Sequence, residues 1–178
     1  MRLFVALDLP WDVQETLSDL AGGLMGARWV PSENYHLTLR FIGELSRHEA
    51  EDIDLALMGL RARGFSLALS GVGVFEKAGR PVNLYAGVER SAGLDHLRGK
   101  IETAMQRAGM PPERKRFVPH VSLGNVEGVP LHKLGTWLQA HSLFKLPPVP
   151  VEHFTLFSSY LGKETPVYTP EVEYALVA

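Results

Sequence analysis

The chain has 178 residues, of which 46% are apolar and 21% charged, and its formal net charge is −2. These values predict a soluble globular protein with one good core, or two small lobes that share one. The absence of cysteine excludes disulfides, thiolate nucleophiles and cysteine-based metal sites. The near-neutral charge argues against a protein that holds a long nucleic-acid duplex over a broad basic face.

The N-terminal apolar run from Leu3 to Leu7 ends at Asp8 and Pro10. It is too short for the core of a signal peptide, and no stretch of the chain is apolar enough to span a membrane. The sequence therefore predicts a cytoplasmic protein with no membrane partner.

The spacing of apolar residues predicts strands and helices that alternate along the chain. In order, we expect a strand at 2–9, a helix at 11–24, a strand at 35–43, a helix from Ser46 to about Arg63 with a capping box at Ser46 and Glu49, hairpin strands at 65–74 and 83–88, a helix at 91–108, a strand at 117–124, a helix at 131–143, and strands at 151–157 and 167–177. Each half of the chain surrounds one histidine-containing strand, which predicts a pseudo-twofold arrangement.

The strand that begins at Tyr35 alternates strictly between apolar and polar side chains. Because successive strand residues point to opposite faces, the apolar set from Tyr35 to Phe41 is expected in the core. His36, Thr38 and Arg40 would then lie in a row on the other face, each roughly 6.5–7 Å from the next.

A later stretch repeats this pattern, with His120 and Ser122 on one face of a strand. A single histidine on a strand is more often structural, but two His-x-Thr/Ser motifs of the same parity indicate a paired site. Two histidines across a cleft suit an in-line phosphoryl displacement, because one accepts a proton from the nucleophile and the other protonates the leaving oxygen. The neighbouring hydroxyls can donate to phosphoryl oxygens as negative charge grows there.

With both motifs in view, the chain resembles the two-histidine (2H) phosphoesterases, and among them the bacterial and archaeal RNA 2′,3′-cyclic phosphodiesterases, also called 2′-5′ RNA ligases. The resemblance covers nearly all 178 residues and rests on RLFVALDLP, NYHLTLRFIGE, FVPHVSLGN and LFSSYLGKETPVYTP. It implies an α+β fold and a single domain over residues 1–178. Two pseudo-symmetric lobes of antiparallel strands would line a central cleft, with helices outside, and each lobe would contribute one motif.

The resemblance also implies hydrolysis of a terminal 2′,3′-cyclic phosphate to a 2′-phosphomonoester without metal or cofactor, and some members also join or cleave 2′-5′ linkages. His36, Thr38, His120 and Ser122 match the four motif positions of the family. We assign His36 as proton donor and His120 as proton acceptor, although the sequence does not decide between the two orders. The implied partners are RNA ends that carry the cyclic phosphate, such as tRNA fragments or short oligonucleotides, and we expect a monomer.

The chain departs from the family pattern at two places. Ser122 replaces the usual Thr, and Gly124 and Asn125 stand where many relatives carry an Arg after the second motif. Arg40, expected in line with the first motif, is therefore predicted to bind the phosphate and neutralise its charge.

Two aromatic residues are predicted to stack a base: Phe4, on the cleft-side face of the first strand, and Tyr85. Ordinary packing is the alternative for both. The basic run Arg114-Lys115-Arg116 is either a solvated loop or a contact to RNA phosphates near the second motif.

Two other functions remain open. A non-catalytic module that binds nucleotides or RNA ends could use the same cleft, although the presence of both histidines favours catalysis. A metallohydrolase is disfavoured, because the other histidines show no ligand spacing such as H-x-H or H-E-x-x-H.

Overall fold

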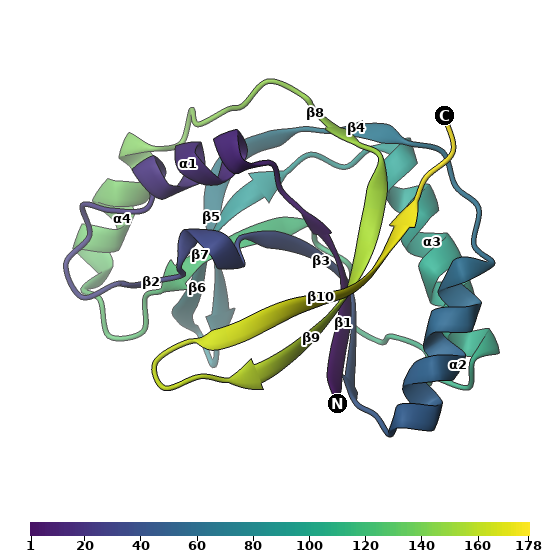
Figure 1. Ribbon diagram of the computed structural model, residues 1–178. Coiled ribbons are helices and arrows are strands. Elements are labelled where there is room, and N and C mark those ends of the chain that lie inside the picture. Colours follow the sequence, from purple (N-terminus) through teal and green to yellow (C-terminus); the bar gives the residue numbers. More distant parts are fainter.

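The computed structural model describes residues 1–178 and has an α+β architecture (Figure 1). The strands are β1 (Arg2–Asp8), β2 (Arg28–Trp29), β3 (His36–Glu44), β4 (Phe65–Leu67), β5 (Leu69–Lys77), β6 (Arg80–Val88), β7 (His120–Asn125), β8 (Val149–Val151), β9 (His153–Leu161) and β10 (Pro166–Ala175). They form one antiparallel sheet in the order β10-β9-β1-β3, a second in the order β2-β7-β6-β5, and a separate β4–β8 pair. The expected α+β class and its antiparallel sheets are confirmed.

The helices are α1 (Trp11–Leu20), α2 (Arg47–Met58), α3 (Ala92–Arg107) and α4 (Leu131–Ala140). All four were expected, but α1, α2 and α4 end a few residues earlier than the periodicity indicates. The capping box of α2 is present: the Glu49 N–H donates to Ser46 Oγ at 3.2 Å, and the Ser46 N–H donates to Glu49 Oε1 at 3.1 Å. None of the helices has the length and apolar character needed to cross a bilayer.

The two sheets do not correspond to the two halves of the sequence. The first sheet joins β1 and β3 to β9 and β10 from the end of the chain, whereas β2, which precedes β3, lies in the second sheet. α2 and α3 pack on each other and against the first sheet, and α1 and α4 lie at the opposite end of the molecule (Figure 1). The expected pseudo-twofold pattern is therefore built from interleaved segments.

A single cluster of 35 buried apolar residues runs through the molecule. β1 lies between β3 and β9, and its residues from Leu3 to Leu7 are at most 3% exposed. Its continuous apolar run fits this burial, because side chains on both faces of the strand are covered.

β3 contains a β-bulge that decides which of its side chains face the cleft. Ala6 pairs with Thr38 but Val5 pairs with Arg40, so Leu39 is an extra residue in the ladder. An extra residue reverses the alternation of side chains beyond it. Phe41 is accordingly 44% exposed and Arg40 only 6% exposed, the opposite of the sequence expectation.

β7 has the same irregularity at the corresponding position. Tyr85 pairs with Ser122 and Leu84 pairs with Gly124, which leaves Leu123 as the extra residue. Both motif strands therefore present their His and hydroxyl residues to one side and then change face immediately afterwards.

Candidate active site

The two histidine motifs meet at one cavity between the sheets. His36 and Thr38 on β3, and His120 and Ser122 on β7, line a space of about 220 Å³. Tyr168 of β10 lines the same space. The structure thus brings together the four residues that the sequence motifs single out.

Both imidazole rings are oriented by the same local hydrogen bond. His36 Nδ1 lies 2.7 Å from the carbonyl oxygen of Asn34, and His120 Nδ1 lies 2.7 Å from that of Val118. Because a carbonyl can only accept, the proton of each neutral ring is fixed on Nδ1. Each Nε2 is therefore the atom available for proton transfer.

The two hydroxyls have different partners. Thr38 Oγ1 lies 2.8 Å from Nε2 of His36, so the Thr38 hydroxyl donates to the neutral ring. Ser122 Oγ accepts a hydrogen bond of 3.1 Å from Nδ2 of Asn83, which leaves the hydroxyl proton of Ser122 free to donate.

Burial lowers the pKa of both imidazoles below the ordinary value. For His36, burial is the main cause, the hydrogen bond to Asn34 opposes it, and the neighbouring His120 lowers the pKa further. For His120, burial again dominates, and the hydrogen bond to Val118 opposes it. Both rings are therefore mainly neutral at pH 7 in the free protein, and an anion between them would favour the charged forms.

Aromatic side chains pack tightly around His36. Its ring centroid lies 5.0 Å from that of Phe4 and 5.2 Å from that of Tyr168. Phe4 also stacks on Phe157 at 5.2 Å and is only 3% exposed. Phe4 lines a cavity beside His36 and Thr38 and packs against the His36 ring, and its role in base stacking stays a prediction.

A second aromatic group supports His120. Tyr85 stacks on Phe75 at 4.4 Å, and its centroid lies 5.5 Å from that of His120. Gly73 makes room for this ring, because a Cβ there would lie 2.5 Å from the Tyr85 hydroxyl oxygen. Tyr85 is half-buried, and its role in base stacking stays a prediction.

Arg40 does not face the cavity, so the expected alignment with His36 and Thr38 is wrong. Beyond the bulge its guanidinium turns towards α3, where Nε donates to Glu102 Oε2 at 2.8 Å. It also donates to the carbonyl oxygens of Phe41 and Pro111, at 2.7 Å and 2.5 Å. Arg40 therefore joins β3, α3 and the following linker, and it is not placed to bind a phosphate.

Other cations lie nearer the motifs. Arg2 lines a cavity of about 670 Å³ together with His36, Thr38 and Tyr168. Arg28 of β2 donates to Asn125 Oδ1 at 3.0 Å, at the position where the sequence lacks the Arg of many relatives.

Sequence reasoning missed several residues of the site, above all Tyr168, Phe157 and Asn83. Tyr168 and Phe157 lie in the last two long strands, and no local pattern links them to a histidine far away in the chain. Their only signal was the closing segment LFSSYLGKETPVYTP as part of the family resemblance. Asn83 reaches Ser122 because β6 and β7 are paired.

The remaining histidines stand apart from the cavity. His153 lies 2.8 Å from Asp8 and 3.7 Å from Glu173, and His141 stacks on Trp137 at 4.1 Å. No group of three or more histidine and carboxylate side chains is arranged to hold a metal ion.

Two facing sheets with one His-x-Thr/Ser motif each are the arrangement of the two-histidine phosphoesterases. A family model described as "LigT like Phosphoesterase" matches residues 7–85 and 87–168. The chain therefore belongs to the LigT-like phosphoesterase family.

Relatives resemble the chain over most of its length. The RNA 2′,3′-cyclic phosphodiesterase of Thermotoga maritima is 33% identical over 177 residues, which cover 94% of this chain and 91% of that protein. The protein of the same name from Aeropyrum pernix is 35% identical over 141 residues, covering 78% and 80%.

Solved structures agree in fold. TT0787 of Thermus thermophilus superposes with a TM-score of 0.80 at 30% identity, over 98% of this chain and 97% of that one. Escherichia coli LigT complexed with 3′-AMP superposes with a TM-score of 0.80 at 25% identity, over 99% and 98%.

Proposed function

We propose that the protein hydrolyses the 2′,3′-cyclic phosphate at the end of an RNA to a 2′-phosphomonoester. The observation that carries this proposal is the pair of imidazoles whose Nδ1 atoms are both fixed by carbonyl oxygens at one small cavity. Nε2 of His120 has no partner in the protein, and Nε2 of His36 contacts only the hydroxyl of Thr38, so both Nε2 atoms can exchange protons with a substrate. The names of the relatives and the 3′-AMP bound to Escherichia coli LigT support a nucleotide substrate.

His120 acts as the base in this mechanism. Its Nε2 accepts no hydrogen bond from the protein, so its lone pair can take a proton from the attacking water. The water oxygen bonds to phosphorus on the side opposite the 3′ oxygen. Burial lowers the pKa of His120, so the ring is neutral near pH 7 and can accept the proton of the water.

His36 acts as the acid. The bound phosphate carries a negative charge, which offsets the burial of His36 and favours its protonated form. As the bond between phosphorus and the 3′ oxygen breaks, Nε2 of His36 gives its proton to that oxygen. The products are a 2′-phosphate and a 3′-hydroxyl, and the two rings exchange their protons with solvent before the next turnover.

The remaining groups stabilise the charge that develops on the phosphoryl oxygens. Ser122 donates its free hydroxyl proton, and Thr38 donates once His36 is protonated and no longer accepts from it. Arg2 supplies positive charge from the adjoining cavity, a task that the buried Arg40 cannot perform.

The same groups would also serve ligation, in which a ribose hydroxyl takes the place of water and forms a 2′-5′ linkage. We propose short RNA ends, including tRNA fragments, as partners, and residues 1–178 as one functional domain that acts as a monomer. The non-catalytic module remains the competing function.

Turnover of an oligonucleotide that ends in a 2′,3′-cyclic phosphate tests the proposal. Two imidazoles handle both proton transfers, so the rate should be the same with and without EDTA. No turnover by folded protein would favour a binding module, and a loss in EDTA that a divalent ion restores would favour a metal-dependent hydrolase.

The pH dependence of kcat/KM should be bell-shaped, with its maximum below the ordinary imidazole value of about 6.5. One histidine must be neutral and the other protonated, and burial lowers the pKa of both. The two limbs belong to the coupled pair. The bell for kcat should lie at higher pH, because the bound phosphate stabilises the imidazolium. A kcat/KM profile that is flat from about pH 5 to 9 contradicts the mechanism.

Removing a hydroxyl should slow the reaction with little change in folding. Ser122→Ala loses a hydrogen bond to a charged oxygen, worth roughly 1.5–3 kcal/mol, or about a 10- to 150-fold loss in kcat/KM. Thr38→Ala should lose at least as much, because its hydroxyl also contacts His36. Ser122→Thr is the matched control and should be nearly neutral, since it keeps the donor. Steady-state kinetics and thermal unfolding check this; a Ser122→Ala variant with normal rates would exclude this hydroxyl as a phosphate ligand.

A further inference from the structure

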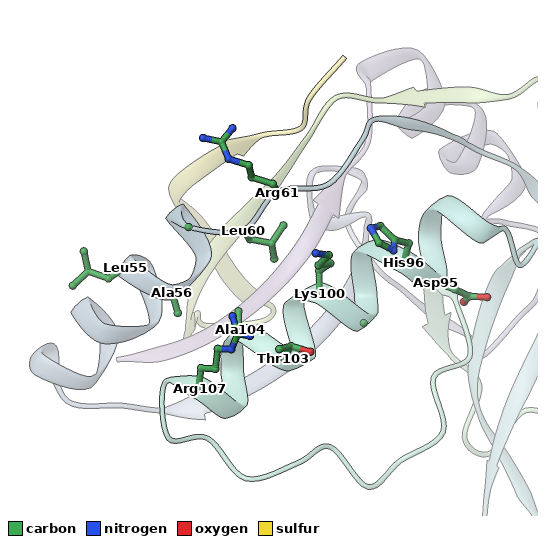
Figure 2. Close-up of a pocket in the computed structure, with 12 residues that line it drawn as sticks. Leu55, Ala56, Leu60, Arg61, Asp95, His96, Lys100, Thr103, Ala104 and Arg107 are labelled. Carbon is green, nitrogen blue, oxygen red and sulfur yellow. The ribbon is translucent and has the colours of Figure 1, made fainter.

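A larger groove lies between α2 and α3 (Figure 2). None of its lining residues also lines the cavity that contains His36 and His120. Its volume is about 960 Å³. Leu60 and Ala104 contribute apolar surface. Three cations also line it: Arg61, from the segment after α2, and Lys100 and Arg107 of α3.

The charges of this groove are strongly unbalanced. Arg61, Lys100 and Arg107 are exposed, and none lies within ion-pair distance of a carboxylate. The lining contains one acidic residue, Asp95, which is engaged by Arg90 at 3.0 Å. A chain with a net charge of −2 thus keeps a local surplus of unpaired positive charge here.

The linker from α3 to β7 continues this surplus towards the active site. Arg107 ends α3, and the exposed cations Arg114, Lys115 and Arg116 follow before His120. The acid of this linker, Glu113, lies 3.8 Å from Arg40 and is therefore paired. Even fully extended, the four residues from Arg116 to His120 span at most about 14 Å, so the basic run lies near the cleft.

The linker is also held in place. The buried guanidinium of Arg40 donates to the carbonyl oxygen of Pro111, and the Glu113 N–H donates to Glu102 of α3 at 2.9 Å. These bonds fix the start of the linker against the first sheet and α3. The basic run therefore extends from an anchored segment.

We propose that these six cations form a basic track that binds the phosphate backbone of the RNA whose cyclic-phosphate end lies in the cleft. The proposal rests on the function proposed above. The track consists of Arg61, Lys100, Arg107, Arg114, Lys115 and Arg116. Lys100 and Arg107 are separated by about 10 Å along α3, and the linker that carries Arg114, Lys115 and Arg116 starts where α3 ends, so the cations are spread along this surface and do not converge on one point. Cations spread in this way match the repeated charges of a polynucleotide better than a single small anion, which would need converging donors.

The track gives the protein a preference for RNA longer than a dinucleotide. The cleft binds the terminal nucleotide, whereas the track contributes sequence-independent affinity that falls with salt. Wild-type protein should therefore show a higher kcat/KM on a stem-loop RNA with a cyclic-phosphate end than on a dinucleotide with the same end, and added salt should reduce this advantage.

Charge reversal tests the track. Lys100→Glu with Arg107→Glu, and separately Arg114→Glu with Arg116→Glu, should each lower kcat/KM on the stem-loop RNA at least about tenfold at low salt, while the dinucleotide rate stays within about twofold. Lys133→Glu is the matched control, because Lys133 is an exposed cation on α4 at the other end of the molecule. Neutral Gln substitutions at the same four positions should give smaller losses in the same direction, and each removed contact should reduce the log–log salt slope by about 0.7.

The outcomes separate the track from the catalytic function. If wild-type protein hydrolyses both substrates without a length preference, or if the variants lose both rates equally or neither, the track is wrong and the catalytic proposal stands. If folded wild-type protein hydrolyses neither substrate, the catalytic proposal fails. The track then survives only if the reversed charges still weaken binding of the stem-loop RNA, measured by fluorescence anisotropy.

Discussion

Replacing His36 or His120 by Ala should each lower kcat by about 10²–10⁴-fold, the usual contribution of one general acid or base. Both rings line one cavity, where Nε2 of His120 has no partner in the protein and Nε2 of His36 contacts only the hydroxyl of Thr38. No third histidine lines this cavity. Both variants should remain folded, because each change removes a half-buried ring that the aromatic neighbours can partly replace.

The double variant should fall by less than the product of the two single losses, because the rings act as one unit. His48→Ala is a matched control, since His48 lies exposed on α2 and should not affect turnover. The pH profiles test the order of the roles: His120→Ala should lose the acid limb, and His36→Ala the alkaline limb. Near-normal turnover by either single variant would exclude that histidine as the acid or base.

Replacing Arg40 by Met should lower the free energy of unfolding by about 3–5 kcal/mol, as expected when one member of a buried ion pair is removed. The change leaves Glu102 and the carbonyl oxygen of Pro111 without their guanidinium donor. Burial alone would raise the pKa of Glu102, but the Glu113 N–H and Arg40 together lower it. Because the pKa of Glu102 is lower in the folded state than in the unfolded state, its ionised form stabilises the fold above the unfolded-state pKa. This stabilisation is lost as the pH falls through the folded-state pKa, so the difference in stability between wild type and Arg40→Met should shrink in acid.

Denaturant unfolding of Arg40→Met measures this loss, and Arg47→Met is the control, because Arg47 is 93% exposed and pairs only with Glu51 on the surface of α2. At a temperature where Arg40→Met is folded, its kcat/KM should stay within about threefold of wild type. Unchanged stability combined with a large loss of kcat/KM would contradict this structural role and would indicate that Arg40 binds the phosphate.

Local patterns predicted much of the fold. Ser46 and Glu49 marked the start of α2 because a capping box is contained within one turn. The alternation around His36 and Thr38 predicted a strand and placed both side chains on one face, since period two is set by the backbone alone. The second motif strand followed from the same argument.

The bulges at Leu39 and Leu123 were the main local feature that the alternation concealed. An apolar residue inserted between Thr38 and Arg40 continues the same pattern whether or not the ladder skips it. The burial of Arg40 depends on Glu102 and Pro111, which lie far along the chain. No property of the NYHLTLRFIGE segment distinguishes a phosphate ligand from a buried structural arginine.

The pairing of strands that lie far apart in the chain could not be predicted from the sequence either. Tyr168 meets His36 because β9 and β10 join the sheet that begins with β1, and nothing in either strand states which sheet it will join. The interleaving of the two lobes has the same cause, since apolar strands of similar length can pair in many orders.

The most direct test of the central claim is the position of the phosphate on the product. Wild-type protein is incubated in EDTA with an RNA that ends in a 2′,3′-cyclic phosphate, and the 2′- and 3′-phosphomonoesters are resolved by chromatography. The account predicts a 2′-phosphate formed by wild type and almost none formed by His36→Ala or His120→Ala. A 3′-phosphate product, or equal turnover by the variants, would contradict it.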